Sequence, residues 1–185
     1  MSISDYIFKI LLMGDVTGCK TAFVQRYISG FFTGDLRLTL GVDYYSKTTL
    51  FKDKEVKLQI WNFGGEERFQ FLLPKYCEGS DGAFFMYDIT NKQSIDYLSD
   101  WAQIIRENSG DIPIMLIGSK LDLHKLREIS HDEGILAAKE YNLAAFLEVS
   151  SKTGENVDKA FRIMIKLLVE KYSQNTKEIS NSQIN

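Results

Sequence analysis

The segment GDVTGCKT occupies residues 14–21 and follows a nearly continuous apolar run, YIFKILLM, at residues 6–13. The run predicts a buried strand, and Gly14 and Gly18 predict a turn at its end. Residues 21–28 then have the pattern of a helix. A strand, a glycine-containing turn and a helix in this order provide the local geometry that a phosphate-binding loop requires.

Strand-like and helical segments alternate through the rest of the chain, which is typical of an α/β fold with a mostly parallel sheet between two helical layers. Residues 52–55 predict the turn of an antiparallel hairpin. We expect one domain over residues 1–172, followed by a disordered polar tail at residues 173–185. The expected strands are 42–51, 56–62, 83–89, 112–117 and 144–149, and the expected helices are 94–106, 130–141 and 157–172.

Composition limits the classes of function. The chain has 185 residues, a net charge of −3, 44% hydrophobic residues and 25% charged residues, as in an ordinary globular domain. This charge gives no electrostatic reason to expect nucleic acid or an anionic membrane as a partner. Two cysteines, Cys19 and Cys77, are too few for a disulfide framework and favour a reducing compartment. The first apolar run is too short for a signal sequence or a membrane span.

The segment at residues 14–21 is a candidate phosphate-binding loop because backbone N–H groups and a helix N-terminus both attract anions. Gly14, Lys20 and Thr21 fit the pattern G-x-x-x-x-G-K-[ST], whereas Cys19 replaces its second glycine. A side chain at this position crowds backbone that must approach phosphate closely, so we expect weaker phosphate binding. Taken alone, the segment fits a purely structural glycine turn equally well.

Four further segments extend the pattern: TLGVDY at residues 39–44, WNFGGEERF at 61–69, GSKLD at 118–122 and EVSSKTGENV at 148–157. Together with residues 14–21 they resemble the nucleotide-binding frame of a Ras-superfamily small GTPase, closest to the Rab branch. The resemblance implies the three-layer P-loop NTPase fold, with a six-stranded sheet, one antiparallel edge strand and about five helices. It also implies a switch protein that binds GTP and GDP with Mg²⁺ and hydrolyses GTP.

The same resemblance implies roles for individual residues. Thr21 and Thr39 are expected to ligate Mg²⁺, and Asn62 is expected to contact a magnesium-bound water. The residues expected to act in hydrolysis are Glu66, Thr39, Gly65 and Lys20. Those expected to bind phosphate are Gly14, Asp15, Val16, Thr17, Gly18, Cys19, Lys20 and Thr21.

Guanine recognition is expected to depend on Asp122, whose carboxylate would accept both N–H groups from the guanine edge. Adenine lacks that pair of donors, so Asp122 would distinguish GTP from ATP. Ser119 replaces the asparagine of the family pattern and makes fewer hydrogen bonds, so some loss of affinity is expected. The residues expected around guanine are Phe32, Ser119, Lys120, Asp122, Ser150, Ser151 and Lys152.

Three positions depart from the family pattern where magnesium and water are handled. Asn62 replaces an aspartate and removes a negative charge, Glu66 replaces the glutamine that orients water, and Val16 replaces a small residue near the γ-phosphate. We therefore expect slow hydrolysis. The alternative is a pseudo-GTPase that holds nucleotide as an interaction scaffold. A third reading, an interaction protein that binds no nucleotide, draws on Cys19 and Ser119.

Three aromatic residues, Tyr44, Trp61 and Tyr76, match positions that Rab-like proteins turn toward effectors, although packing between the sheet and its neighbouring loops explains them equally well. The resemblance also implies an exchange factor and an activating protein. No cysteine follows Cys77 and residue 2 is serine, so neither prenylation nor myristoylation is expected. The sequence thus predicts a cytoplasmic protein without a direct lipid anchor.

Overall fold

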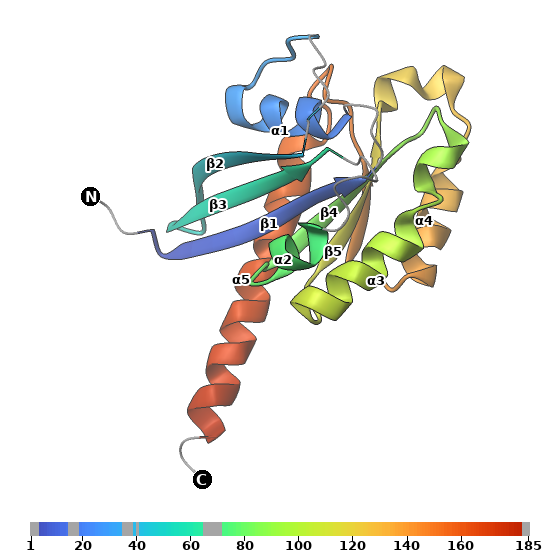
Figure 1. The fold of residues 1–185 in the computed structure, drawn as a ribbon. Coiled ribbons are helices and arrows are strands. Elements are labelled where there is room, and N and C mark those ends of the chain that lie inside the picture. The colour runs from blue at the N-terminus through green and yellow to red at the C-terminus, as the bar shows by residue number, and fades with distance from the viewer. Residues whose placement is uncertain (1–3, 15–18, 35–38, 40, 65–71, 183–185) are drawn as a thin grey trace.

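The computed structural model (Figure 1) describes residues 4–14, 19–34, 39, 41–64 and 72–182, with side chains described up to residue 175. Its strands form one six-stranded sheet in the order β2-β3-β1-β4-β5-β6. The pair β2–β3 is antiparallel, and every other pair in the sheet is parallel. The strands are β1 (Tyr6–Gly14), β2 (Val42–Phe51), β3 (Lys54–Phe63), β4 (Gly82–Asp88), β5 (Ile114–Ser119) and β6 (Ala145–Glu148).

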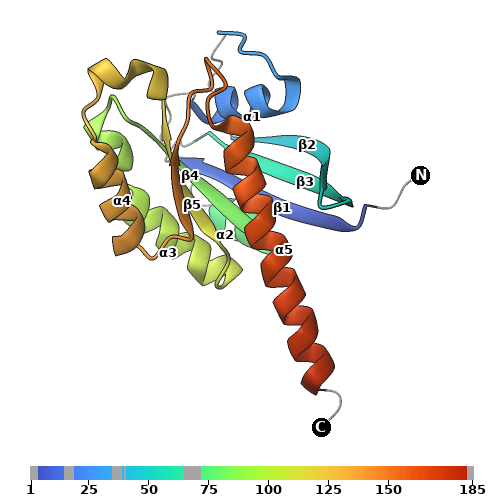
Figure 2. The same ribbon diagram turned by 180° about the vertical axis from the view of Figure 1, so that it is seen from behind.

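Helices cover both faces of the sheet, which confirms the predicted three-layer α/β fold. Helices α1 and α5 lie on one face, and α2, α3 and α4 lie on the other (Figures 1 and 2). The α-helices are α1 (Cys19–Ser29), α2 (Leu73–Cys77), α3 (Leu98–Ser109), α4 (His131–Glu140) and α5 (Val157–Ser182), and the 3₁₀ helices are η2 (Lys92–Ile95) and η3 (Leu121–Leu126). No helix in the described ranges is both long and apolar enough to cross a membrane.

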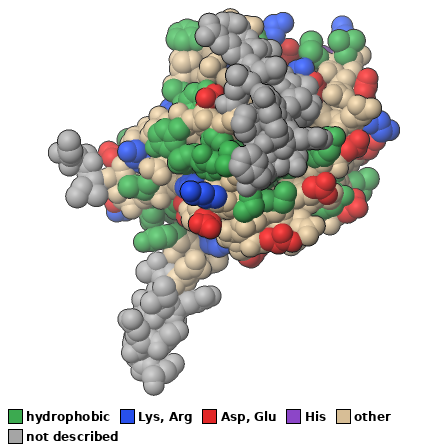
Figure 3. Space-filling view, viewed as in Figure 1, with side chains coloured by type: hydrophobic (Ala, Val, Ile, Leu, Met, Phe, Trp, Pro, Cys, Tyr) green, Lys and Arg blue, Asp and Glu red, His purple; other side chains and the backbone are tan. Residues whose placement is uncertain are grey.

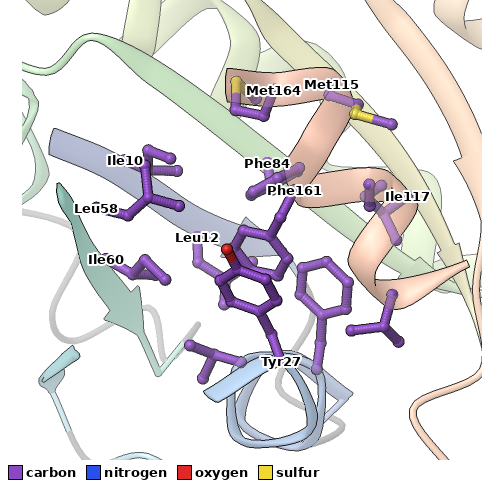
Figure 4. Packing of buried hydrophobic residues seen from close by; sticks show 14 of the residues in the cluster. Ile10, Leu12, Tyr27, Leu58, Ile60, Phe84, Met115, Ile117, Phe161 and Met164 are labelled. Atoms are coloured by element: carbon purple, nitrogen blue, oxygen red, sulfur yellow. The ribbon is translucent and has the colours of Figure 1, made fainter. Parts of the chain in front are cut away.

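The core between the sheet and helices α1 and α5 is rich in aromatic residues (Figure 4). Tyr27 of α1 stacks on Phe161 of α5, with ring centroids 3.6 Å apart and planes 8° from parallel. Phe23 of α1 stacks on the same Phe161 and meets Phe84 of β4 edge to face. Because these buried rings interlock, the start of α1 is held in a fixed position beside the end of β1.

The second core lies between the sheet and helices α2, α3 and α4, and it includes Trp101 and Ile105 of α3. Strands β2 and β3 extend beyond these helices at one edge of the sheet (Figure 1). Figure 3 shows hydrophobic side chains gathered on the front face above these two strands. The same edge therefore carries exposed apolar surface that no described helix covers.

Several element boundaries differ from the sequence prediction. Strand β3 begins at Lys54, so Lys52 and Asp53 alone form the hairpin turn, with φ values of 48° and 63°. Such a two-residue turn matches the natural twist of paired strands better than the expected four-residue turn. The helix expected at residues 94–106 begins later, at Leu98. Helix α5 continues to Ser182, beyond the expected end at residue 172, because residues 173–182 contain no glycine or proline that would end it.

Candidate functional site

The site begins where β1 ends and α1 starts. Gly14 has a φ of +131°, and a Cβ there would lie 2.0 Å from the carbonyl oxygen of Met86, so this position requires glycine. Lys20, 2% exposed, folds back over the strand end and donates a hydrogen bond from Nζ to the Gly14 carbonyl oxygen at 3.0 Å. The buried ammonium thus lies at the carboxyl edge of the sheet. The remaining residues expected to bind phosphate in this loop, Asp15, Val16, Thr17 and Gly18, lie outside the described residues.

Three buried polar side chains from different elements meet beside Lys20. The hydroxyl oxygens of Thr21, on α1, and Thr39, which precedes β2, lie 2.8 Å apart. Asn62, near the end of β3, donates from Nδ2 to both hydroxyl oxygens at 3.1 Å. These are the three residues that the sequence predicted around a metal ion, and the structure brings them together. Gly65 and Glu66, expected to act on the γ-phosphate and on water, lie outside the described residues.

The donor and the acceptor of each hydrogen bond in this cluster can be assigned. Thr39 Oγ1 donates to Asp43 Oδ2 at 3.0 Å. Because each hydroxyl has one proton, the Thr21 hydroxyl must be the donor in its bond to Thr39. Asn62 is fully buried, and its Oδ1 has no hydrogen-bond partner among the described residues. Within the described residues, the cluster therefore contains one acceptor without a donor, Asn62 Oδ1, and its chain of hydrogen bonds ends at the carboxylate of Asp43.

The cluster fits a hard divalent cation. Mg²⁺ takes oxygen ligands in an octahedron with bonds of about 2.0–2.1 Å, so neighbouring ligand oxygens lie about 2.9 Å apart. The Thr21 and Thr39 hydroxyl oxygens lie 2.8 Å apart in their hydrogen bond, so both oxygens are close enough together to serve one cation. The orphaned Oδ1 of Asn62 is suited to accept a hydrogen bond from a metal-bound water. Asp43 was not predicted here, because its place opposite Asn62 depends on the antiparallel register of β2 and β3.

A cavity of about 330 Å³, within the usual size range of small-molecule pockets, borders the first turn of α1, which also carries Thr21. Cys19 and Ala22 of α1 line one part of it. Most residues expected around guanine also line it, and they come from three separate segments of the chain. These residues are Phe32, Ser119, Lys120, Asp122, Ser151 and Lys152.

Hydrogen bonds hold the polar groups of the cavity in place. Ser150 donates from Oγ to Asp122 Oδ1 at 2.6 Å and accepts from the backbone N–H of Thr153 at 3.1 Å. Ser150 therefore orients the carboxylate, although it does not itself line the cavity. Ser119 donates to the Tyr87 carbonyl oxygen of the neighbouring strand at 2.7 Å. Its short side chain is thus used to join β5 to β4.

Lys120 and Asp88 form an ion pair at the end of β4, with Nζ and Oδ2 2.5 Å apart and the carboxylate 3% exposed. Lys120 has a left-handed backbone, with φ 65° and ψ 37°. A lysine rarely adopts this conformation, and such backbone strain is concentrated at functional sites. The sequence identified Lys120 but gave no indication of Asp88, because their pairing depends on the parallel alignment of β4 and β5.

Two arginines support the loop that follows β6. Arg127 binds both carboxylate oxygens of Glu148, at 2.5 and 2.9 Å, and this hydrogen bonding raises the pKa of Arg127. Arg26 of α1 donates to the Thr153 carbonyl oxygen at 3.1 Å. A Cβ at Gly154, whose φ is +87°, would lie 2.4 Å from Arg26 Nη2, so the loop packs directly against this guanidinium.

The three aromatic residues expected at an effector surface form one row. Tyr44 of β2 and Trp61 of β3 meet edge to face with centroids 5.3 Å apart, and Trp61 and Tyr76 of α2 lie 5.5 Å apart. Tyr44 is 49% exposed. The row runs from the apolar face of β2 and β3 onto α2, and it is compatible with both packing and recognition as the role of these residues.

Comparison with known proteins shows the family of the chain. The family model described as "Ras family" matches residues 9–170, from within β1 to within α5. The chain is also similar to "Ras-related protein Rab-19" of Xenopus laevis. The two are 36% identical over 166 residues, which cover 89% of this chain and 78% of the Rab-19 chain.

Proposed function

Because the chain belongs to the Ras family and to its Rab-like members, we propose that it is a switch protein that binds GTP and GDP with Mg²⁺ and hydrolyses GTP slowly. The observation that carries the proposal is the arrangement at the carboxyl edge of the sheet. The cavity lined by Lys120 and Asp122 borders the first turn of α1, and Thr21 of the same turn belongs to the cluster with Thr39 and Asn62. A base site and a phosphate–metal site side by side suit a nucleoside phosphate.

In this proposal the guanine base enters the cavity of about 330 Å³ and its N–H edge donates to Asp122. Ser150 already holds one carboxylate oxygen, which fixes the direction in which Asp122 accepts. The Lys120 stem covers one side of the base, Phe32 covers an edge, and the backbone N–H of Ser151 meets the guanine oxygen. Lys152 closes the same loop, and Ser119 contributes indirectly through its bond to β4.

The phosphates would lie over residues 14–21, with the Lys20 ammonium along the β- and γ-phosphates. Thr21 and Thr39 would hold Mg²⁺ through their hydroxyl oxygens, and Asn62 would hold a metal-bound water through Oδ1. Mg²⁺, when bound, neutralises charge on the phosphate oxygens. Gly65 would donate its backbone N–H to the γ-phosphate, and Glu66 would accept from the attacking water.

Slow hydrolysis follows from three side chains. Asn62 supplies no negative charge to the metal, Glu66 repels the γ-phosphate and cannot donate to it, and the bulk of Val16 hinders an arginine inserted by an activating protein. The test is a single-turnover time course: load the protein with GTP and Mg²⁺, remove free nucleotide, and quantify bound GTP and GDP. Slow conversion to GDP is expected. Fast conversion would contradict the expectation of slow hydrolysis, and failure to retain nucleotide would overturn the whole proposal.

A second candidate function is a nucleotide-bound scaffold that does not hydrolyse GTP. Asn62 favours it, because Nδ2 donates to both threonine hydroxyls, which an ionised aspartate could not do. The Thr21–Thr39 contact can therefore form without metal. GTP that persists unchanged through the time course would support this candidate.

For either function, effectors are proposed to dock on the row of Tyr44, Trp61 and Tyr76, in which Tyr44 is exposed and the other two rings are half-buried. An exchange factor and an activating protein are proposed from the family. Cys19 and Cys77 are both buried thiols, which suit a reducing compartment, and we propose the cytoplasm.

A further inference from the structure

We propose that Asp43 supplies, through the hydroxyl of Thr39, the negative charge that Asn62 cannot bring to the metal site. This inference rests on the proposed function, since it assumes that Thr21 and Thr39 ligate Mg²⁺. Asp43 would be a positioning residue: it would act on the cation through Thr39 and touch neither the cation nor the substrate.

The placement of Asp43 follows from the sheet. It lies on β2 directly opposite Asn62 of β3 in the antiparallel register. Its Oδ2 accepts the Thr39 hydroxyl proton at 3.0 Å. The Thr39 proton therefore points away from Thr21, and both lone pairs of Thr39 Oγ1 face the cluster, where Thr21 and Asn62 now donate to them.

That orientation is the one that a metal ligand needs. A hydroxyl that ligates a cation becomes a stronger hydrogen-bond donor, and a carboxylate that accepts its proton strengthens the oxygen as a ligand. Partners of this kind typically change metal affinity by about 10–100-fold. Asn62, as an amide, cannot add negative charge, and the described residues contain no cluster of three acidic, histidine or cysteine side chains that could hold a metal by themselves. In the part of the chain that the structure describes, Asp43 is the carboxylate that accepts a hydrogen bond from this cluster.

The competing explanation is that Asp43 merely fastens Thr39 by a hydrogen bond. The variants Asp43→Asn and Asp43→Ala separate the two. Asparagine keeps an oxygen that accepts the Thr39 proton but removes the charge, whereas alanine removes both. Asp53→Asn is the matched control, because it makes the same chemical change in the turn at the far end of β2.

The experiment measures release of a fluorescent, non-hydrolysable GTP analogue from the full chain at a series of free Mg²⁺ concentrations and in EDTA. Binding of Mn²⁺, followed by the loss of its free paramagnetic resonance signal, gives metal affinity directly. For Asp43→Asn we expect the Mg²⁺ midpoint and the Mn²⁺ dissociation constant to rise about tenfold. We also expect release in EDTA to match the unaltered protein, because the charge has no role without metal.

Two further variants are Asn62→Asp alone and the double variant Asp43→Asn/Asn62→Asp. The double variant moves the carboxylate from position 43 on β2 to the partner position 62 on β3. The double variant should recover most of the lost metal affinity, and this pair remains informative if Asp43→Asn alone fails to fold. The inference would be overturned if the Mg²⁺ midpoint were unchanged in Asp43→Asn but raised in Asp43→Ala. It would also be overturned if Asp43→Asn accelerated nucleotide release in EDTA as much as it does in Mg²⁺. If the unaltered protein binds the GTP analogue but its release shows no dependence on Mg²⁺, both the proposed metal site and this inference are wrong.

Discussion

Ser150 and Asp122 lie 28 residues apart in the chain, and the Ser150 hydroxyl donates to the Asp122 carboxylate at 2.6 Å. The same hydroxyl oxygen accepts the backbone N–H of Thr153, so Ser150 fixes both the carboxylate and the turn of its own loop. Guanine selection is therefore proposed to depend on a side chain that does not line the cavity.

Replacing Ser150 with alanine should loosen Asp122. A hydrogen bond to a charged group contributes about 1.5–3 kcal/mol, so Ser150→Ala is expected to speed GDP release at least about tenfold. Stopped-flow release of a fluorescent GDP analogue measures this. Ser151→Ala is the control, since only the backbone of Ser151 is expected to contact guanine. Equal rates for the two variants would contradict the role of Ser150.

Gly64 allows Thr39 to approach β3. A Cβ at Gly64 would lie 2.0 Å from the Thr39 carbonyl oxygen, and the Gly64 N–H donates to the Gly41 carbonyl oxygen at 2.8 Å. Backbone atoms cannot give way cheaply, so Gly64→Ala should displace Thr39 from Thr21. We expect GTP affinity to fall about tenfold, about 1.4 kcal/mol, with GDP affinity nearly unchanged.

The measurement is the ratio of GTP to GDP affinity in Mg²⁺. Thr39→Ala provides the comparison, because Gly64→Ala is proposed to act through that residue. The double variant should lose no more GTP affinity than the worse single variant. Fully additive losses would show that Gly64 acts elsewhere.

Glu66 is expected to slow hydrolysis by repelling the γ-phosphate. Glu66→Gln removes the charge and adds an N–H donor, so the single-turnover rate should rise about tenfold, which corresponds to about 1.4 kcal/mol in the barrier. Glu67→Gln makes the same change one residue later and should leave the rate near that of the unaltered protein. A slower Glu66→Gln variant would identify the carboxylate as a useful base.

Gly154 and Arg26 should be energetically coupled. Gly154→Ala adds a Cβ 2.4 Å from Arg26 Nη2 at a φ of +87°. Left-handed backbone costs a residue with a Cβ about 1–2 kcal/mol, and displacing Arg26 also breaks its bond to Thr153. In an Arg26→Ala background only the backbone cost remains, so the losses in unfolding free energy should not add. Denaturant titration of the three variants tests this.

Asp81 should make stability depend on pH. Burial raises the pKa of its carboxyl above the ordinary value of 3.8, although the Lys9 backbone N–H, which donates at 2.7 Å, partly opposes this. Because the pKa is higher in the folded state, the contribution to stability is present below the ordinary pKa and is lost as pH rises through the folded pKa.

Asp81→Asn keeps an acceptor for Lys9 and removes the buried charge. The variant should therefore be more stable than the unaltered protein near neutral pH, and the difference should shrink toward pH ~4. Urea unfolding at several pH values measures it. A difference that grows on acidification would show the opposite sign of the shift.

The sequence predicted the fold class because its apolar runs and helical faces alternate clearly. The meeting of Thr21, Thr39 and Asn62 was expected from the resemblance to small GTPases. The sequence did not predict Asp43 or Asp88. Both act across neighbouring strands, and the register that aligns them depends on the length of a turn and on sheet order. Local patterns do not contain that information.

The first and last residues of the helices were also harder to predict from the sequence than the presence of the helices themselves. The expected helix at residues 94–106 begins at Leu98, because residues 92–95 form a separate 3₁₀ helix in which Asn91 accepts from the Gln93 N–H. The helical pattern of apolar residues continues through both pieces, so periodicity alone could not separate them. Helix α5 likewise continues past the last clearly amphipathic turn, where sequence gave no signal to stop.

One helix, α1, contacts both ends of the proposed ligand site. Its first turn carries Lys20 and Thr21, and Arg26, further along the helix, donates a hydrogen bond to the loop that follows β6. Base and phosphates would therefore be held by one rigid body, so that binding one end places the other at high effective concentration. Guanosine and pyrophosphate, offered as separate molecules, should together bind far more weakly than GDP. Such a protein would bind the intact nucleotide and would hardly bind the separate base and phosphate fragments.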